Sequence, residues 1–228
     1  SAYPDIPLMA EETAEALHDP ANAELKRKVL EHVARIRPEL GEHEVLGAID
    51  RGRHAGGPSG RFWTLDPIDG TKGYIRNDQY AIGLALIENG RLELGVLGCP
   101  NLPAGSECTA GVVFSARRGS GSFMASIHDG HVAHPIRVSP VASPSELVIC
   151  QSVESGHTSH GRAARIAANL GTTMPSIHVD SQCKYGLVAR GDAGLYMRLP
   201  SKNSTYEEMI WDHAAGALIV EEAGGREI

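Results

Sequence analysis

Apolar residues near the start of the chain recur every three or four positions, which is the spacing of one helical face. In the stretch "ANAELKRKVLEHVARI" these positions are Leu25, Val29, Val33 and Ile36. Asp19-Pro20, just before it, is typical of a helix start, with a capping residue followed by proline at the first helical position. We therefore predict a helix here and a loop over residues 47–61, which are glycine-rich and basic.

The middle of the chain has the pattern of strands joined by tight turns. "RFWTL" is strand-like, and "YAIGLALIENGRLELGVLGCP" predicts a hairpin because Asn89-Gly90 separates two apolar runs. "AIGLALI" is continuously apolar, which predicts a strand buried on both faces. "GVVFSARRGSGSF" predicts a further pair of strands.

The last third of the chain alternates between the two kinds of element. Strands are predicted in "ELVICQS", "SIHVD" and "AGLYMRL". Helices are predicted in "TSHGRAARIAANL", "QCKYGLVARG" and "DHAAGALIVEEAGG", the last with a glycine stop. Hairpins followed by alternating strands and helices predict a layered, mixed α and β fold.

Composition narrows the class of protein. The chain has 228 residues, of which 42% are apolar, enough for one large domain with a substantial core. Its 21 basic and 28 acidic residues give a net charge of −7, which disfavours binding of a nucleic-acid polymer but not of a small anion. No apolar run approaches the ~18 residues of a membrane helix, so we predict no membrane contact. Four cysteines without a CxxC pair indicate reduced thiols in a cytoplasmic protein.

The two ends are unusual for a complete protein. The chain opens at "SAYPDIPLMAEE" without a start methionine, and it closes at "EEAGGREI", where a helix has ended on two glycines and a strand begins. We therefore expect the sequence to be a fragment, or a chain whose outer segments are missing.

The stretch "WTLDPIDGTKGY" carries the clearest candidate chemistry. Asp66 ends a predicted strand and Asp69 follows in a turn shaped by a proline and a glycine, so both carboxylates can point at one place. Two such anions repel each other unless a cation lies between them, and Mg²⁺ prefers hard oxygen ligands. The Ile68 carbonyl and the Thr71 hydroxyl lie at the same mouth. The alternative is an Asx-type turn, in which Asp and Gly serve the backbone alone.

Two further acidic positions bear on this choice. Glu11 and Glu12 precede a predicted helix, and Asp212 in "WDHAAG" lies at a helix start. Each has an ordinary explanation, a solvated pair at a helix start for the glutamates and an N-cap for the aspartate. The three acidic motifs together, in this order, favour a metal cluster.

Taken with these motifs, "WTLDPIDGTKGY" and "WDHAAGALIVEEAGG" resemble the lithium-sensitive, magnesium-dependent sugar-phosphatase superfamily that includes the inositol monophosphatases. The segments "SVESGHTSH" and "DSQCKYGLVARGDAGLYMRLP" narrow the resemblance to the 3′(2′),5′-bisphosphate nucleotidases of fungi and plants. The likeness covers nearly the whole chain. It implies a layered αβαβα sandwich in one catalytic domain, residues 1–228, with subdomains at roughly 1–139 and 140–228. The first would hold the metal and the second the nucleotide.

The resemblance also implies a catalytic centre with two or three Mg²⁺ ions and inhibition by Li⁺. Thr71 would help to orient and deprotonate the attacking water, and Asp69 would act beside it as a shared carboxylate. The residue at position 10 is Ala10, where the family usually has glycine. The implied metal ligands are Glu11, Asp66, the Ile68 carbonyl, Asp69 and Asp212.

The substrate implied is adenosine 3′,5′-bisphosphate, hydrolysed to AMP and phosphate, with its sulfated form, the cofactor of sulfate transfer, as a second substrate. The residues that would bind it are Thr71, His157, Ser181, Lys184, Arg198 and Asp212. Taken singly, His157 is also compatible with a loop histidine, Ser181 with a helix cap and Lys184 with a solvated helix lysine. Arg198 stands in an apolar stretch, where its charge needs a partner.

The chain differs from the family pattern at both ends, and other functions are compatible with its sequence. The family's water-activating aspartate would lie before residue 1, and the part that follows "AGG" is missing. We expect a monomeric enzyme with a small nucleotide substrate. The rivals are an inositol phosphate phosphatase of the same superfamily, a truncated, non-catalytic nucleotide-binding or regulatory protein, and a structural domain whose acidic turns are only caps.

Overall fold

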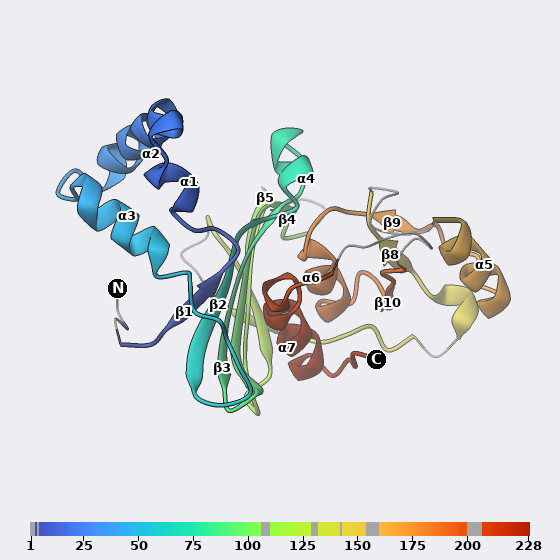
Figure 1. Cartoon of the computed structure of the whole chain (residues 1–228). Coiled ribbons are helices and arrows are strands. Elements are labelled where there is room, and N and C mark those ends of the chain that lie inside the picture. The colour runs from blue at the N-terminus through green and yellow to red at the C-terminus, as the bar shows by residue number, and fades with distance from the viewer. Residues whose placement is uncertain are drawn as a thin grey trace.

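The computed structural model describes Tyr3 and residues 5–105, 110–128, 132–141, 143–153, 160–199 and 207–228. Its layers are a seven-stranded sheet, a pair of helices, a three-stranded sheet and an outer helix (Figure 1). The layered, mixed α and β fold predicted from the sequence is confirmed. Within the described residues, no helix combines the length and apolar character needed to cross a bilayer.

The larger sheet has its strands in chain order, with β1 parallel to β2 and the other neighbours antiparallel. The predicted hairpin is present, and its two turn residues, Asn89 and Gly90, have φ angles of 50° and 75°, as a two-residue type I′ turn requires. The strands are β1 Leu8–Ala10, β2 Arg61–Asp69, β3 Ala81–Glu88, β4 Arg91–Pro103, β5 Ala110–Arg117, β6 Ser122–Ser126 and β7 His134–Ile136.

One prediction about this sheet is wrong. Strand β3 is not buried on both faces, because Ile82 is 38% exposed and Leu84 is only partly buried. The opposite face of β3 carries Ala81 and Ala85, which are fully buried beneath the helical layer. A continuous apolar run in the sequence therefore does not show that only one face of β3 is fully covered by other elements.

The smaller sheet consists of parallel strands in the order β10-β8-β9. Helix α5 (His160–Leu170) packs on its outer side through Ala163 and Ile166. The sequence placed Arg198 inside a strand, but β10 ends before it because parallel pairing with β8 extends over two residues only. The strands are β8 Ile149–Gln151, β9 Ile177–His178 and β10 Leu195–Tyr196, and β8 is preceded by the 3₁₀ turn η2, Pro144–Glu146.

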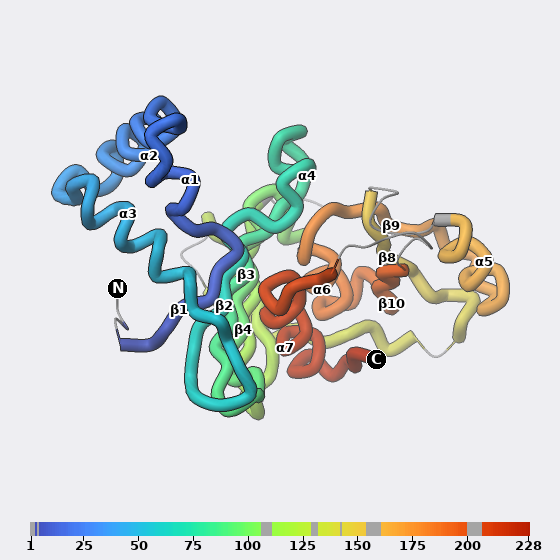
Figure 2. The backbone as a smooth tube through the Cα atoms, viewed as in Figure 1, coloured from blue at the N-terminus to red at the C-terminus, as the bar shows by residue number. Residues whose placement is uncertain are grey.

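Helices α6 (Cys183–Ala189) and α7 (Ala214–Glu222) lie between the two sheets, as the tube in Figure 2 makes clear. Helix α7 lies close to β4 because Gly95 has no side chain there. A Cβ at that position would come within 2.7 Å of the Ala215 carbonyl oxygen. The predicted glycine stop of α7 is present, with Gly224 at a φ of 95°.

The N-terminal helices form a small cluster beyond the β1 edge of the large sheet (Figure 1). Asp19 caps the predicted helix start through its contact with the Ala21 N–H, 2.9 Å long. The predicted loop over residues 47–61 is wrong in its first part, since helix α3 runs on to Asp50 because Leu46 is buried against Leu17. The elements are α1 Glu15–His18, η1 Pro20–Asn22, α2 Ala23–Ile36 and α3 Glu42–Asp50.

Candidate metal and substrate site

The first two aspartates owe their common direction to an irregularity in β2. The strand does not end at Asp66, as the sequence suggested, but continues to Asp69. Asp66 pairs with Gly83 and Asp69 with Ala81, so three steps on β2 match two on β3. This extra residue is a β-bulge. Without it, side chains three positions apart would point to opposite faces of the sheet; with it, both point to the helical layer.

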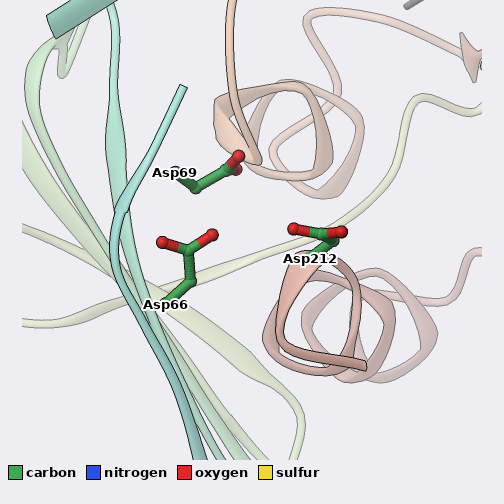
Figure 3. Close-up of side chains that lie close together, drawn as sticks. All are labelled: Asp66, Asp69 and Asp212. Atoms are coloured by element: carbon green, nitrogen blue, oxygen red, sulfur yellow. The ribbon is translucent and has the colours of Figure 1, made fainter. Parts of the chain in front are cut away.

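The third aspartate approaches from the helical layer. Asp212 ends the 3₁₀ turn η3 (Ile210–Asp212), just before α7. One carboxylate oxygen from each of Asp66, Asp69 and Asp212 lies within 4.8 Å of the others. Figure 3 shows these side chains directed into the same space, two from the strand and one from the helical side. Asp66 is 1% exposed and Asp212 8%.

Of the ordinary interpretations of these aspartates, the Asx-type turn holds, whereas the N-cap is wrong, because the N-cap residue of α7 is His213 and not Asp212. The Ile68 N–H donates to Asp66 Oδ1 at 3.0 Å, which is an Asx-type turn. The Met209 N–H donates to Asp212 Oδ2 at 2.9 Å, a contact of the capping kind at the start of η3. These local bonds orient the carboxylates, and they do not separate them. The turn and the metal site are therefore compatible descriptions of the same residues.

The electrostatics of the cluster call for a cation. Burial, followed by the charges of Asp69 and Glu11, raises the pKa of Asp66 to about 9. Burial also raises the pKa of Asp69, although the nearby Lys184 opposes this effect. Converging, desolvated carboxylates of this kind are stable as anions only when a positive charge lies among them. The all-oxygen donor set fits Mg²⁺.

Glu11 and Thr71 lie at the rim of the same cavity. Glu11 follows β1, donates its N–H to the Leu65 carbonyl at 3.2 Å and hydrogen-bonds Asp66 through its side chain. Burial is the main cause of the raised pKa of Glu11. Thr71 opens the short helix α4 (Thr71–Ile75), and its hydroxyl donates to the Ile68 carbonyl at 3.3 Å.

A single cavity gathers every predicted site residue that the structure describes. His157 lies outside the described residues, so its position is not established. The lining residues among those predicted are Glu11, Asp66, Ile68, Asp69, Thr71, Ser181, Lys184, Arg198 and Asp212.

Lys184 is not the solvated lysine that its place on a helix allows. Its side chain is buried, its Nζ donates to the Val179 carbonyl at 3.1 Å, and it lies 5.3 Å from the centre of the Tyr196 ring. Burial lowers the pKa of Lys184, while the charge of Asp69 opposes that shift. Lys184 thus brings an amino group to the wall of the cavity, close enough to Asp69 for the two charges to interact.

Ser181 and Arg198 complete the cavity wall opposite β2. Ser181 has a φ of 64°, and its hydroxyl accepts a hydrogen bond from the Cys183 N–H at 3.2 Å. Its side chain thus caps the first N–H of α6, although the N-cap position itself belongs to Gln182 and not to Ser181. Arg198 forms an ion pair with Glu208, the partner that its partly buried charge needs. No sequence motif pointed to Glu208, which lies ten positions further along the chain.

Comparison with known proteins agrees with this geometry. The family model described as "Inositol monophosphatase family" matches residues 3–227. The chain belongs to the inositol monophosphatase family. Among solved structures, an IMPase of Thermotoga maritima superposes with a TM-score of 0.56 at 27% identity, covering 89% of this chain and 67% of that one. CysQ from Bacteroides thetaiotaomicron gives a TM-score of 0.56 at 24% identity, covering 80% and 71%, and supports the fold alone.

Several curated relatives of this family member are named 3′(2′),5′-bisphosphate nucleotidase. A 3′(2′),5′-bisphosphate nucleotidase of Schizosaccharomyces pombe is 42% identical over 239 residues, which are 98% of this chain and 67% of the relative. The protein of that name from Emericella nidulans is also 42% identical, covering 98% and 71%. In Arabidopsis thaliana, 3′(2′),5′-bisphosphate nucleotidase 1 is 45% identical, covering 81% and 55%. The chain thus spans between 55% and 71% of the length of these relatives.

Proposed function

We propose that this chain carries the catalytic centre of a Mg²⁺-dependent phosphatase that removes the 3′-phosphate of adenosine 3′,5′-bisphosphate. The products are AMP and inorganic phosphate, and the sulfated nucleotide is a second substrate. The observation that carries the proposal is the convergence of Asp66, Asp69 and Asp212 in a cavity that Lys184 and Arg198 also line. The name shared by the curated relatives supports the choice of a nucleotide.

The metal ligands are the three aspartates with the Glu11 side chain and the Ile68 carbonyl. When bound there, two or three Mg²⁺ ions supply a water of lowered pKa and neutralise the charge of the phosphoryl group and leaving oxygen. Li⁺ inhibits by taking one of these positions. The bulge in β2 aims Asp66 and Asp69 in advance, so their orientation does not have to be created during the reaction.

Thr71 orients the attacking water. Its hydroxyl donates to the Ile68 carbonyl, so the lone pairs of its oxygen remain available to accept a hydrogen bond from the attacking water molecule. Asp69 lies two positions earlier and receives that water's proton or holds its position through the cluster. Thr71 and Asp69 are therefore the catalytic residues of the proposal.

The nucleotide is held from the 140–228 half of the chain. Lys184 acts on a phosphate as a point charge and Arg198 as a planar fork. Ser181 offers a hydroxyl beside the cavity, and His157 is assigned to the nucleotide by resemblance alone. Residues 1–139 and 140–228 are subdomains of one catalytic domain in this proposal. The protein is cytoplasmic and monomeric in this proposal. Size-exclusion chromatography of the purified chain tests whether it is a monomer.

The test is phosphate release from adenosine 3′,5′-bisphosphate and from inositol 1-phosphate, each with Mg²⁺ and with or without Li⁺. We expect Li⁺-sensitive release from the nucleotide and little from the inositol phosphate. Preferential release from inositol 1-phosphate favours the rival inositol phosphatase. Nucleotide binding without release from either substrate favours a non-catalytic nucleotide-binding protein.

A further inference from the structure

Gln182 touches both sides of the carboxylate cluster, although no candidate role was assigned to it from the sequence. Its backbone N–H donates a short hydrogen bond to Asp69 Oδ2. Its side-chain Nε2 donates to the Trp211 carbonyl at 2.9 Å, and Trp211 directly precedes Asp212. One residue thus connects an aspartate at the end of β2 with the segment that carries the third aspartate.

We propose that Gln182 is a positioning residue that fixes the separation of Asp69 and Asp212, and through it the affinity of the cluster for divalent metal ions. The inference rests on the metal site proposed above. Gln182 does not line the cavity, so it acts through the aspartates and not on the substrate.

The surroundings of Gln182 hold it in one place. The side chain is 2% exposed and lies against Gly83, where an added Cβ would be 2.8 Å from Nε2. Gly83 is the sheet partner of Asp66. Consequently the side-chain amide lies against the β3 residue that pairs with Asp66. The backbone N–H reaches Asp69, and the amide N–H reaches the segment that carries Asp212.

The backbone before Gln182 is turned to make this contact possible. Ser181 has a φ of 64°, an unfavourable angle for a residue with a side chain. This turn directs the next N–H at Asp69, and Gln182 is then the N-cap residue of α6, with φ −64° and ψ −4°. The unfavourable angle at Ser181 comes immediately before a buried residue that forms two hydrogen bonds. Strained backbone of this kind persists where the surrounding structure holds it in place, and it is commonly found at functional sites.

The physical need for such a connection follows from charge. One carboxylate oxygen from each of Asp66, Asp69 and Asp212 lies within 4.8 Å of the others, and Asp66 and Asp212 are buried, so the ionised carboxylates repel one another unless a metal ion lies between them. Groups that orient metal ligands from behind typically change metal affinity or activity by about 10–100-fold when removed. Loss of the Gln182 side chain frees η3 to move Asp212 away, whereas the backbone bond to Asp69 remains.

The experiment is a Mn²⁺ titration of the unmutated chain and of Gln182→Met. Binding is measured by calorimetry and by the electron paramagnetic resonance signal of free Mn²⁺. Methionine keeps the volume and removes the donor. We expect the Mn²⁺ dissociation constant to rise by about 10-fold or more. At saturating metal the KM for the nucleotide should change less than twofold, because Gln182 does not line the cavity.

Gln151→Met is the matched control. Gln151 is also a buried glutamine, 7% exposed, but it lies in β8 and belongs to the smaller sheet. We expect this variant to lose thermal stability to a similar extent while its Mn²⁺ affinity stays within twofold of the unmutated chain. A merely structural role for Gln182 would make the two variants alike in metal affinity.

Mn²⁺ binding by folded Gln182→Met within twofold of the unmutated chain overturns the inference. If that variant does not fold, Gln182→Asn replaces it, since the shorter amide stays polar but cannot span the same distance; unchanged affinity there has the same meaning. An unmutated chain that binds no Mn²⁺ overturns both this inference and the metal site. A chain that binds Mn²⁺ but releases no phosphate overturns only the proposed reaction.

Discussion

Arg76 and Asp180, which are 104 residues apart in the chain, form an ion pair at the edge of the cavity. The Asp180 side chain is only 6% exposed, and its neighbour in sequence is Ser181, with its left-handed backbone. The pair therefore joins the segment that follows α4 to the segment that leads into α6. These are the two stretches that bring Thr71 and Lys184 to the site.

Removing the cation of this pair should destabilise the protein. Arg76→Ala leaves a mostly buried carboxylate without its arginine, and we expect a loss of about 1–2 kcal/mol after allowing for the exposure of the arginine. Denaturant unfolding measures the change. Arg61→Ala is the control, because its pair with Glu88 is 3.7 Å long and lies on the surface. Equal losses in the two variants would contradict a special role for the buried partner.

Asp69→Asn should abolish most of the proposed activity. The substitution preserves the shape of the side chain but removes a charge that the metal cluster shares, so we expect phosphate release to fall on the order of 10³-fold or more. Asp192→Asn serves as the control, since the Asp192 side chain is 45% exposed, pairs with Arg190 and does not line the cavity. Near-parental turnover of Asp69→Asn with Mg²⁺ present would rule out the assigned role.

Metal binding should release a proton at neutral pH. Because the pKa of Asp66 is raised to about 9, its carboxyl group is protonated at pH 7 in the metal-free protein, and a divalent ion must displace that proton. Affinity for Mn²⁺ should therefore increase from pH 7 to 9. Calorimetry in two buffers with different ionisation enthalpies counts the proton. Binding without proton release would show that Asp66 is already ionised.

The same shift predicts how the metal-free protein responds to pH. The folded-state pKa of Asp66, about 9, exceeds the unfolded value near 4, so between these limits the folded state binds more protons than the unfolded state. The free energy of unfolding should then fall as pH rises through this window. Thermal unfolding at several pH values with a chelator present checks the direction, and saturating Mg²⁺ should remove this pH dependence, because Asp66 is then ionised in both the folded and the unfolded state.

Gly70 is predicted to be intolerant of a side chain for two separable reasons. Its φ is 80°, and an added Cβ would lie 2.8 Å from the Ser181 Cβ. Gly119→Ala is a matched control, since Gly119 has a φ of 73° with nothing within 4 Å of an added Cβ. Both substitutions should cost about 1–2 kcal/mol for the backbone. Only Gly70→Ala should also reduce phosphate release, by displacing Ser181 or Thr71.

Local patterns were enough to predict the elements that depend on neighbours in sequence. The hairpin around Asn89-Gly90 and the glycine stop of α7 require particular backbone angles, which few residues adopt easily. The end of α3 depends instead on packing against α1, so the glycine-rich sequence at this point wrongly predicted a loop. The uneven cover of the two faces of β3 could not be predicted either, because it is a property of the layers.

The acidic residues of the candidate site could be predicted because a carboxylate next to an apolar segment is costly to bury unless a cation or hydrogen bonds compensate its charge. The means by which they converge were not. The bulge between Asp66 and Asp69 exists only in the pairing with β3, and the contact of Gln182 with Trp211 joins segments that no sequence spacing relates. The assignment of His157 to the nucleotide stays a prediction.

The origin of the aspartates in two distant parts of the chain, β2 and η3, has a consequence for synthesis. Asp212 follows Asp69 by roughly 140 residues, which takes about 7–30 s at about 5–20 residues per second. The large sheet can form during that interval with two of its carboxylates already in place. With the proposed metal site, the growing polypeptide would lack its third carboxylate until η3 has emerged, so loading of the metal would report that the second half has folded onto the first.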